Sequence, residues 1–462
     1  MKVARLTPDR MTSGERRAAF WLAGVFSLRM LGLFMILPVF ALYAENLHGH
    51  TPALAGLAIG IYGLTQALCQ IPFGFLSDRY GRKRMIYLGL LIFAAGSVVA
   101  ALADSMWGVI LGRALQGGGA VSAAVMALAA DLTREEHRIK VMAFIGITIG
   151  LSFAVSMILG PVLDGWIGVP GIFWLTGLLA LLGIVVVRFR VPDPIVSRVH
   201  RDAEPVASQF GRVLGDGQLL RLNFGIFTLH LLLTATFVAA PLALRDAGLP
   251  GDQHWRVYLP VLLLSILAMA PFVVLAEKFR RLKPVFIGAV LALASTEFGL
   301  LHRHDTVWAI AGFLLLFFTA FNLLEAMLPS LIAKMAPPDA KGTALGVYSS
   351  SQFLGAFAGG VLGGWLHGGP YGLQGVFAFA SLAALAWLLV AWTMKNPRHL
   401  SSYLLNVGAL DEVEARLLAL RLSEVRGVAE AVVIAADGVA YLKVDRRALD
   451  EAALRQFAAA EG

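Results

Sequence analysis

The stretch GFLSDRYGRKRM, residues 74–85, separates two segments that are almost free of charged side chains. These segments, residues 54–72 and 86–103, each approach the roughly 20 apolar residues that an α-helix needs to cross the hydrocarbon core of a bilayer. Between them, one carboxylate, Asp78, lies among four cations. Charge confined to a short loop between two apolar helices predicts that the chain spans a membrane.

The composition of the whole chain supports the same conclusion. Of its 462 residues, 58% are hydrophobic and 15% are charged, whereas soluble domains are about 45–50% apolar and about 25% charged. The net charge of +8 does not indicate a nucleic-acid partner, because the basic residues punctuate the apolar runs instead of forming one stripe. The single cysteine, Cys69, excludes an intrachain disulfide. The basic start leads into an apolar run too long for a cleaved signal peptide, so we expect a retained first span.

Apolar runs of sufficient length occur twelve times, and their spacing divides the chain in two. The long gap at residues 190–218 is polar and leaves six runs on each side. We therefore expect an all-α membrane protein with an N-terminal six-helix bundle (1–189), a cytoplasmic linker (190–218) and a C-terminal six-helix bundle (219–396). The predicted spans are 18–43, 53–75, 85–104, 107–130, 141–164, 171–189, 219–243, 256–276, 284–302, 306–330, 342–366 and 373–394.

The loop charges predict the orientation of these spans. Most loop cations lie before the first span or in the even-numbered gaps, whereas the odd-numbered gaps contain only Arg245, Arg256 and Arg303. Lys and Arg accumulate on the cytoplasmic side of a membrane. We therefore expect a multi-pass protein of a bacterial-type inner membrane with both termini in the cytoplasm, and the stretch 74–85 in a cytoplasmic loop.

A weak internal repeat supports the division into six and six. GPVLDGWI (160–167) and GGVLGGWL (359–366) share glycine, valine, leucine and tryptophan in the same order. Both halves would begin inside and cross six times, which makes them parallel repeats, and transporters of this design bind substrate near the midplane between the halves. The alternative is a chance likeness between two glycine-rich helices.

Three motifs resemble those of the major facilitator superfamily, over roughly residues 15–395. GFLSDRYGRK is similar to the family's motif A between helices two and three, GRALQGGGA (112–120) to its fourth-helix motif, and GPVLDG to the fifth-helix motif of its antiporters. Asp164 departs from the pattern, because the family usually has glycine there. The matching residues are Gly74, Asp78, Arg79, Gly81, Arg82 and Lys83 in motif A, Arg113, Gln116 and Gly117 in the fourth helix, and Gly160, Pro161 and Gly165 in the fifth.

The resemblance implies a function and an architecture. Further stretches, among them YSSSQFLGAFAGG (348–360), are similar to a branch of drug or proton antiporters that carries a small ferredoxin-like C-terminal domain. The chain is then expected to be a secondary active transporter that exports a small molecule or drug-like solute in exchange for protons by alternating access. Its partners would be that solute, protons and the lipid bilayer.

Asp78 is the residue of motif A that simple anchoring in the headgroup zone does not explain. An acid at the end of a helix can face the positive N-terminus of another helix, worth about 0.3–1 kcal/mol when exposed and up to about 2 kcal/mol when partly buried. In the superfamily's architecture that partner would be the start of the eleventh helix, near residues 341–346, while Arg82 would pair with Asp131. These contacts would form a conformational latch that closes the cytoplasmic side.

Ionisable residues inside spans are costly and are functional candidates by default. Glu325 and His230 are the best candidates for carrying a proton, since histidine titrates near neutral pH. Glu297 lies nearer the end of its span and is interpreted as facing water. For each of these residues the alternative is a satisfied polar group that packs helices. The candidate proton and substrate cavity consists of Arg29, Tyr62, Gln66, His230, Asn322 and Glu325.

The fifth predicted helix has a mechanical interpretation. Pro161 removes a backbone donor and is expected to kink the helix, and its glycines are expected to allow close helix contacts that seal the extracellular side. These glycines are Gly146, Gly150, Gly160 and Gly165. QGGGA (116–120) is not a phosphate loop, because no Lys-Ser/Thr follows it and no strand precedes it.

Residues 400–462 differ from the rest of the chain. They predict a strand, an amphipathic helix with Val413, Leu417 and Leu420 on one face, a hairpin across Asp437-Gly438 and a second helix. This βαββα order fits a ferredoxin-like domain that lacks its last strand. Copper transfer is not expected, because the domain has no cysteine. Ligand sensing, self-association and a passive tail all stay open.

Two other classes of function compete with transport. An enzyme is not supported, since the sequence has no H-E-x-x-H, G-x-S-x-G or Walker A motif, and we predict no catalytic residue, cofactor or metal site. The remaining alternative is a transporter-like sensor that signals through its C-terminal domain without net flux. Its sequence would look similar, so only a flux measurement separates the two.

Overall fold

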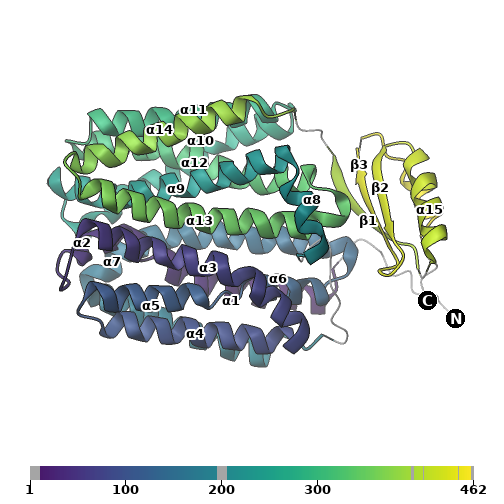
Figure 1. Cartoon of the computed structure of the whole chain (residues 1–462), viewed down its shortest axis with the longest axis horizontal. Helices are drawn as coiled ribbons and strands as arrows, with labels where there is room; N and C mark the ends of the chain where they lie inside the picture. Colours follow the sequence, from purple (N-terminus) through teal and green to yellow (C-terminus); the bar gives the residue numbers. More distant parts are fainter. Residues whose placement is uncertain (1–10, 195–204, 397–399, 409, 446, 459–462) are drawn as a thin grey trace.

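The computed structural model describes residues 11–194, 205–396, 400–408, 410–445 and 447–458. Long helices lie side by side in a bundle, and a small domain of strands and helices packs at one end of it (Figure 1). We call this end the domain end and the opposite end the far end. Part of the predicted linker, residues 195–204, lies outside the described residues.

The N-terminal half is built from seven helices that form six spans. The first span consists of α1 and α2 and the fourth of α5 and α6, while α7 contains both the fifth and the sixth, separated at Gly168 by a backbone φ of 68°. The bounds are α1 Ser13–Phe34, α2 Leu37–Ala44, α3 Pro52–Tyr80, α4 Arg82–Leu102, α5 Met106–Gly118, α6 Ser122–Asp131 and α7 Glu135–Arg190.

The C-terminal half contributes six more spans, one for each long helix. They are α9 Gly217–Asp246, α10 Trp255–Glu277, α11 Leu282–His302, α12 Val307–Met335, α13 Lys341–His367 and α14 Gly372–Trp392. Short helices connect them: η1 Ala207–Gln209, α8 Phe210–Leu214, η2 Gly251–Gln253 and η3 Pro338–Ala340. The described residues therefore contain the twelve predicted spans in the predicted order. The glycine-rich α13 is not among the ten stretches that hydropathy alone identifies, and α7 counts there as one.

Threonine and serine residues cap the N-termini of several helices at the far end. Thr51 accepts a hydrogen bond from the backbone N–H of Leu54 and is followed by Pro52 at the first helical position. Ser105 and Thr306 cap α5 and α12 in the same way. Such caps satisfy backbone donors that the helix itself leaves unpaired, so each short loop can turn directly into the next span.

The two halves meet closely where α3 crosses α13. A methyl group on Gly56 would lie 2.2 Å from the carbonyl oxygen of Gly360 and 2.7 Å from the Cα of Gly364. These are backbone atoms that cannot rotate away, so only glycine allows this approach. Since Gly56 is near the start of α3, the contact belongs to the far end of the bundle.

Gly56→Ala is therefore expected to prevent full closure at the far end. Overpacking typically costs about 1–3 kcal/mol, which would lower the closed population roughly fivefold or more. The measurement is the distance between spin labels at Leu102→Cys and Trp308→Cys, two exposed far-end positions in opposite halves, in a Cys69→Ser background. Gly24→Ala is the matched control, because a methyl group there meets nothing within 4 Å. Identical distance distributions for Gly56→Ala and the control would refute the role of this contact.

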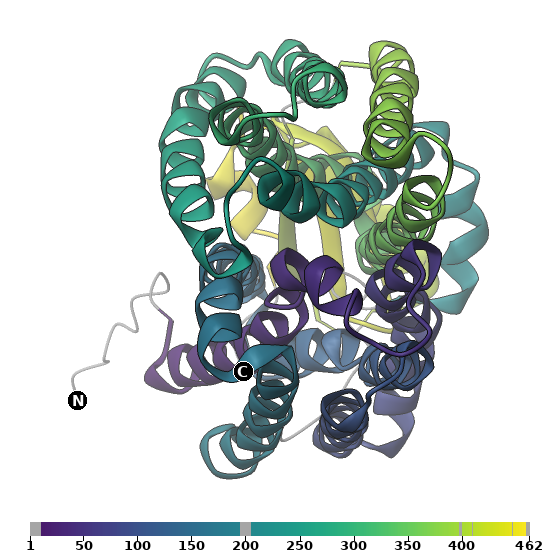
Figure 2. The same ribbon diagram turned by 90° about the vertical axis from the view of Figure 1, so that its left-hand side faces the viewer.

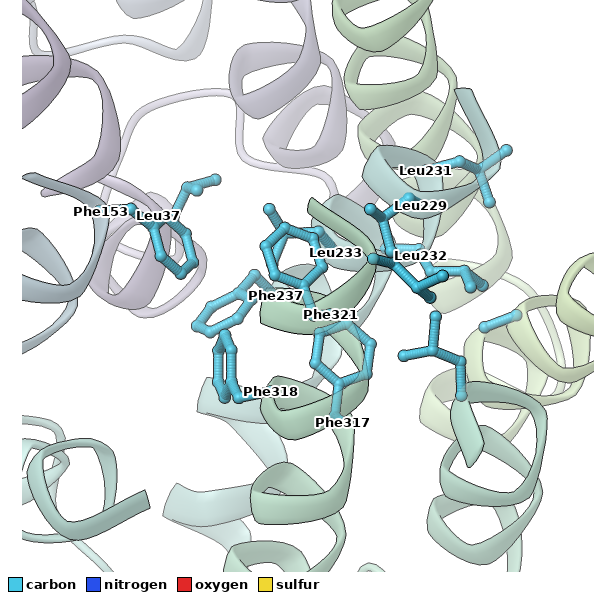
Figure 3. Close-up of a cluster of buried hydrophobic side chains, with 14 of the residues drawn as sticks. Leu37, Phe153, Leu229, Leu231, Leu232, Leu233, Phe237, Phe317, Phe318 and Phe321 are labelled. Atoms are coloured by element: carbon cyan, nitrogen blue, oxygen red, sulfur yellow. The ribbon is translucent and has the colours of Figure 1, made fainter. Parts of the chain in front are cut away.

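Phenylalanine side chains fill the interior between the halves on the far-end side of the bundle centre. Phe153 of α7 packs against Phe318 and Phe321 of α12, with ring centres 6.0 and 5.8 Å apart. Figure 3 shows Phe153 and Leu37 facing the phenylalanines of α9 and α12. The interior at this level is lined by apolar side chains, which disfavour the entry of water and ions.

The fifth span is helical through Pro161, and the turn into the sixth span comes at Gly168, where the left-handed conformation favours glycine. Gly160 makes the expected close contact, 2.5 Å from a methyl group built on it to the carbonyl oxygen of Met35, whereas Gly146 and Gly150 have nothing within 4 Å. The prediction of close packing was wrong for these two glycines.

The C-terminal domain has the predicted βαββα order. It consists of β1 Ser401–Asn406, α15 Glu412–Glu424, β2 Val428–Ile434, β3 Val439–Val444 and α16 Glu451–Arg455. The strands form one antiparallel sheet in the order β1-β3-β2. Val413, Leu417 and Leu420 share one face of α15, but this face is exposed, and the helix packs through Leu418 and Leu422 instead.

Candidate functional site

The N-terminal half holds two buried arginines close to the ring of Tyr62. Arg29 donates hydrogen bonds to the Tyr62 hydroxyl at 2.7 Å, to Ser122 Oγ at 3.2 Å and to Gln66 Oε1. Its guanidinium carbon lies 5.9 Å from the centre of the Tyr62 ring, and that of Arg113 lies 5.1 Å from the same centre. An aromatic face stabilises such cations where water is excluded, so Tyr62 ties the first, second and fourth spans together.

Arg113 and Gln116 of the fourth-helix motif also contact each other. Arg113 Nη1 donates to Gln116 Oε1 at 2.9 Å, and Arg113 Nε donates to the carbonyl of Ala58 at 3.4 Å. Gln116 Nε2 in turn donates to Ser97 Oγ at 2.8 Å. Gly117 lets this helix approach the backbone of Tyr62, since a methyl group on it would lie 2.2 Å from the Tyr62 carbonyl oxygen. The motif therefore positions a satisfied cation beside the seam between the halves.

The C-terminal half contributes a triad of polar side chains, His230, Gln352 and Glu325. Gln352 Nε2 lies 2.8 Å from His230 Nε2 and donates to Glu325 Oε1 at 3.3 Å. His230 Nε2 and Glu325 Oε2 are 3.9 Å apart. His230 and Glu325 were predicted from the sequence, whereas Gln352, which comes from α13 and joins them, was not. His230 and Glu325 are therefore too far apart for a direct hydrogen bond and are linked through Gln352, and a base and an acid placed in this way can take up and release protons.

Asn322 does not join this triad. Its side chain donates to Ser265 Oγ on α10 at 3.1 Å, which ties α12 to α10. Gln66 extends the N-terminal network instead, because it donates to Gln70 Oε1 at 3.3 Å. The predicted cavity residues therefore fall into two groups, one around Tyr62 and one around Gln352, and Asn322 belongs to neither.

The position of Glu297 differs from the one predicted from the sequence. It was expected to face water, but the structure buries it completely between α9 and α11, where its Oε1 accepts a hydrogen bond from Thr236 Oγ1 at 2.8 Å. The prediction rested on how close Glu297 lies to the end of its span in the sequence. It could not show that α9 passes beside that turn of α11.

Motif A forms a compact ionic cluster at the domain end. Arg82 is buried and donates to Asp78, to Ser77 Oγ at 2.9 Å and to Asp131 Oδ2 at 3.2 Å. The predicted pairing of Arg82 with Asp131 is therefore present. Gly81, with a φ of 98°, makes the turn between α3 and α4 that a residue with a side chain would strain.

The other motif A cations have separate roles. Lys83 Nζ donates to the carbonyl of Val191 at 2.6 Å and pairs with Asp193 at 2.9 Å, which fixes the end of α7. Arg79 is exposed and stacks on Tyr80. Among the contacts described for Asp78, none reaches the start of α13, the partner expected for the latch.

A linker residue occupies the space between Asp78 and α13. Pro205 lines a small pocket together with Gly74, Asp78 and Arg82, and a methyl group on Gly346 would lie 2.9 Å from its ring. The linker therefore lies next to both Asp78 and the start of α13, the two predicted partners of the latch.

The far end carries an ion pair between the halves that the sequence analysis did not predict. Arg245 Nη1, at the end of α9, lies 2.5 Å from Glu45 Oε2, just beyond α2. The two residues are 200 positions apart. Beside them, Glu45, His50 and His367 line a small pocket that also spans both halves. A usable signal existed, because Arg245 is one of the few cations in the odd-numbered gaps.

Among the ion pairs described at the domain end, by contrast, none joins the N-terminal half to the C-terminal half. Lys334 pairs with Glu277 inside the C-terminal half, and Arg134 pairs with Glu15 inside the N-terminal half. Together with the α3–α13 crossing, this distribution shows an arrangement in which the halves are joined at the far end.

Reversing one charge of the far-end pair is expected to open that end. Arg245→Glu places two carboxylates together, and because both partners are about 40% exposed the pair contributes only about 0.2–1 kcal/mol. The closed population should therefore fall by roughly two- to fivefold, measured with the labels at Leu102→Cys and Trp308→Cys. The double variant Glu45→Arg with Arg245→Glu should restore it. Failure of this rescue would show that the pair does not hold the halves together.

Comparisons with known proteins agree with this architecture. The sequence profile of the Major Facilitator Superfamily matches residues 22–273 and 222–436. The chain is 49% identical over 451 residues to the inner membrane transport protein YajR of Escherichia coli (strain K12), covering 97% of this chain and 99% of that protein. It is 25% identical over 374 residues to the multidrug resistance protein MdtH of Yersinia enterocolitica, covering 78% of this chain and 91% of that protein.

A solved structure has the same fold. The bacterial homolog of the human lysosomal transporter Spinster, in its inward-facing and unoccupied conformation, superimposes with a TM-score of 0.67 at 14% identity, covering 83% of this chain and 98% of that chain. At this level of identity the likeness concerns the arrangement of helices and not the cargo.

Proposed function

The chain belongs to the Major Facilitator Superfamily and is a multi-pass secondary transporter, not an enzyme, and we propose that it exports a small molecule in exchange for protons. The observation that carries this proposal is the triad of His230, Gln352 and Glu325, which places a base and an acid 3.9 Å apart inside a membrane-spanning half. Intramembrane groups of this kind mark proton and substrate pathways.

The loop charges orient the chain in the membrane. Lys and Arg gather in the loops of the domain end, and such loops face the cytoplasm. We infer that both termini and the C-terminal domain are cytoplasmic, in a bacterial-type inner membrane, and that the far end faces outward. The arrangement closed by Glu45 and Arg245 is then closed to the outside, and a solute would enter from the cytoplasm.

The phenylalanine layer gives this arrangement its barrier. Phe318 and Phe321 precede Glu325 on α12 and lie on its far-end side, with the His230 ring centre 5.8 Å from that of Phe321. Protons from outside therefore cannot reach the triad until the halves separate at the far end. Proton binding at Glu325 would neutralise a charge that is costly at this depth in the membrane. Release of the proton on the cytoplasmic side would return Glu325 to its charged form.

Motif A would stabilise the opposite arrangement. When the cytoplasmic side closes, the start of α13 would approach Asp78 and displace Pro205 from between them. The carboxylate would then face the N-terminal end of α13, a favourable electrostatic contact. Arg82 would hold Asp78 in position through its bonds to Asp131 and Ser77, so that the loop acts as a latch.

A drug-like solute is the cargo that the relatives favour. MdtH is named a multidrug resistance protein, and the residues between the halves combine aromatic surfaces with few polar groups, as many sites for drug-sized ligands do. The Nη atoms of Arg29 donate to Tyr62 and Gln66, and Nη1 of Arg113 donates to Gln116, so the two cations would position the helices of the site instead of selecting one charge.

The test is flux in proteoliposomes with and without an imposed pH gradient, across a panel of fluorescent amphiphilic dyes. We expect at least one dye to accumulate against its own concentration gradient only when the pH gradient is present. Binding without flux for every dye that binds would instead indicate a sensor that signals through its C-terminal domain.

A further inference from the structure

The sheet of the C-terminal domain is buried on both faces, although its helices cover only one. Leu405, Leu442 and Val444 point toward the helices and form the domain core with Leu422 and Leu454. Because side chains alternate along a strand, the intervening residues of β3 point the other way. These are Val439, Tyr441 and Lys443, which are only 4%, 5% and 4% exposed.

The transporter itself covers this second face. The short helix η3 contacts β2 and β3, and α12 contacts β1. Arg280, in the loop between α10 and α11, lies 3.8 Å from Asp445 at the end of β3. Lys443 pairs with Glu430 on the neighbouring strand at 3.6 Å. The helix-free face is therefore a docking surface that the C-terminal half occupies.

The charges around Lys443 come from both the domain and the transporter. Burial lowers the pKa of Lys443, while Glu430 and, from the start of α9, Asp216 raise it and Arg212 lowers it. Arg212 also pairs with Asp339 of η3 at 3.1 Å. The linker helix α8 is thus bonded to η3 through Arg212 and Asp339, and the charges of Arg212 and Asp216 act on Lys443 of the sheet.

The docked domain also reaches the N-terminal half, because β1 contacts α7 as well as α12. Figure 2, which views the bundle from the far end, shows the yellow sheet behind the helices of the C-terminal half and the middle of the bundle. The domain therefore lies across the two halves at the end where they are not joined to each other by a described ion pair. Closing this end requires the two halves to move against each other. During that movement β1 cannot keep its contacts with both α7 and α12.

We propose that the C-terminal domain is a built-in brake, docked through the helix-free face of its sheet, that holds the arrangement closed at the far end and must leave the N-terminal half before the domain end can close. The brake acts on the movement of the halves and does not depend on which solute or ion is carried. Its failure in a test is therefore distinguishable from failure of proton-coupled export.

Lys443→Glu is the variant that tests the brake, because it puts a carboxylate beside Glu430 and Asp216. Two distances report the result in a Cys69→Ser background. One joins labels at Arg416→Cys in the domain and Lys140→Cys in the N-terminal half, and the other joins the far-end labels at Leu102→Cys and Trp308→Cys. The brake requires that the domain moves away and that the far-end-closed population falls by about twofold or more.

A second variant guards against misfolding of the domain. Asp445→Arg sets two cations against each other at a half-exposed position, and adding Arg280→Asp restores an opposite-charge pair. The single variant should release the domain and the double variant should redock it. Arg421→Glu, an exposed residue of α15, is the control that should change neither distance.

Two outcomes would overturn the proposal. If the domain stays in place in both Lys443→Glu and Asp445→Arg, the sheet face does not hold it. If the domain leaves but the far-end distances stay those of the unmodified chain, docking has no control over the halves.

Discussion

Glu325→Gln is expected to abolish proton-driven transport, with a loss of about tenfold or more in the rate at which a pH gradient drives solute. The amide keeps the shape of the side chain and can still accept a hydrogen bond from Gln352, but it cannot bind and release a proton. A permanently neutral group would then stand in place of the carboxylate of the triad. Exchange of solute without a pH gradient should survive, because the halves can still move around the bound solute.

The measurement compares gradient-driven uptake with solute exchange in the same proteoliposomes. Glu277→Gln is the matched control, since this acid is half-exposed at the domain end, where it pairs with Lys334. His230→Gln should resemble Glu325→Gln if the two residues share the proton. Full gradient-driven activity in both triad variants would remove them from the proton pathway.

Asp78→Asn is expected to remove the arrangement that is closed at the domain end. A partly buried carboxylate at a helix N-terminus contributes up to about 2 kcal/mol, and about 1.4 kcal/mol corresponds to a tenfold change in population. The far-end-open population and the transport rate should therefore fall by roughly tenfold. Asparagine preserves the size of the side chain, so the loss would report its charge.

The far-end labels at Leu102→Cys and Trp308→Cys measure this population directly. Arg79→Gln is the control from the same loop, because Arg79 is exposed and stacks only on the neighbouring Tyr80 among the contacts described for it. If Asp78→Asn leaves the far-end-open population unchanged, motif A is an anchor in the headgroup zone and not a latch.

The fold could be predicted because the bilayer leaves a local signal. Each span needs a long apolar run, and each loop shows its charges, so twelve spans and their order can be counted without knowing a contact. The pairing of Arg82 with Asp131 could be predicted for a different reason, since it followed from the resemblance to motif A. The strands of the C-terminal domain could be predicted from the alternation of apolar and polar residues and from the turn at Asp437-Gly438.

Contacts between distant segments were the part that could not be predicted. Glu45 and Arg245 meet only because α2 and α9 adjoin at the far end, and Gln352 joins His230 and Glu325 only because α13 passes between their helices. Spacing along the chain shows neither pairing, although Arg245 stands out as one of the few cations in the odd-numbered gaps. The same reason explains Glu297, whose burial depends on α9.

The exposed face of α15 shows a second limit. Val413, Leu417 and Leu420 follow helical spacing, and such a stripe ordinarily marks the side that packs on a core. Here the helix packs through Leu418 and Leu422, so periodicity identified a helix without identifying its buried side.

The most direct test of the central claim is the movement of protons against the movement of solute. Proteoliposomes containing the full chain and a pH-sensitive dye are given a gradient of a transported fluorescent compound at equal pH on both sides. Proton exchange predicts a pH change inside the vesicles, with protons moving opposite to the compound, and no such change with Glu325→Gln. Movement of the compound at an undiminished rate with no change in internal pH would contradict the account.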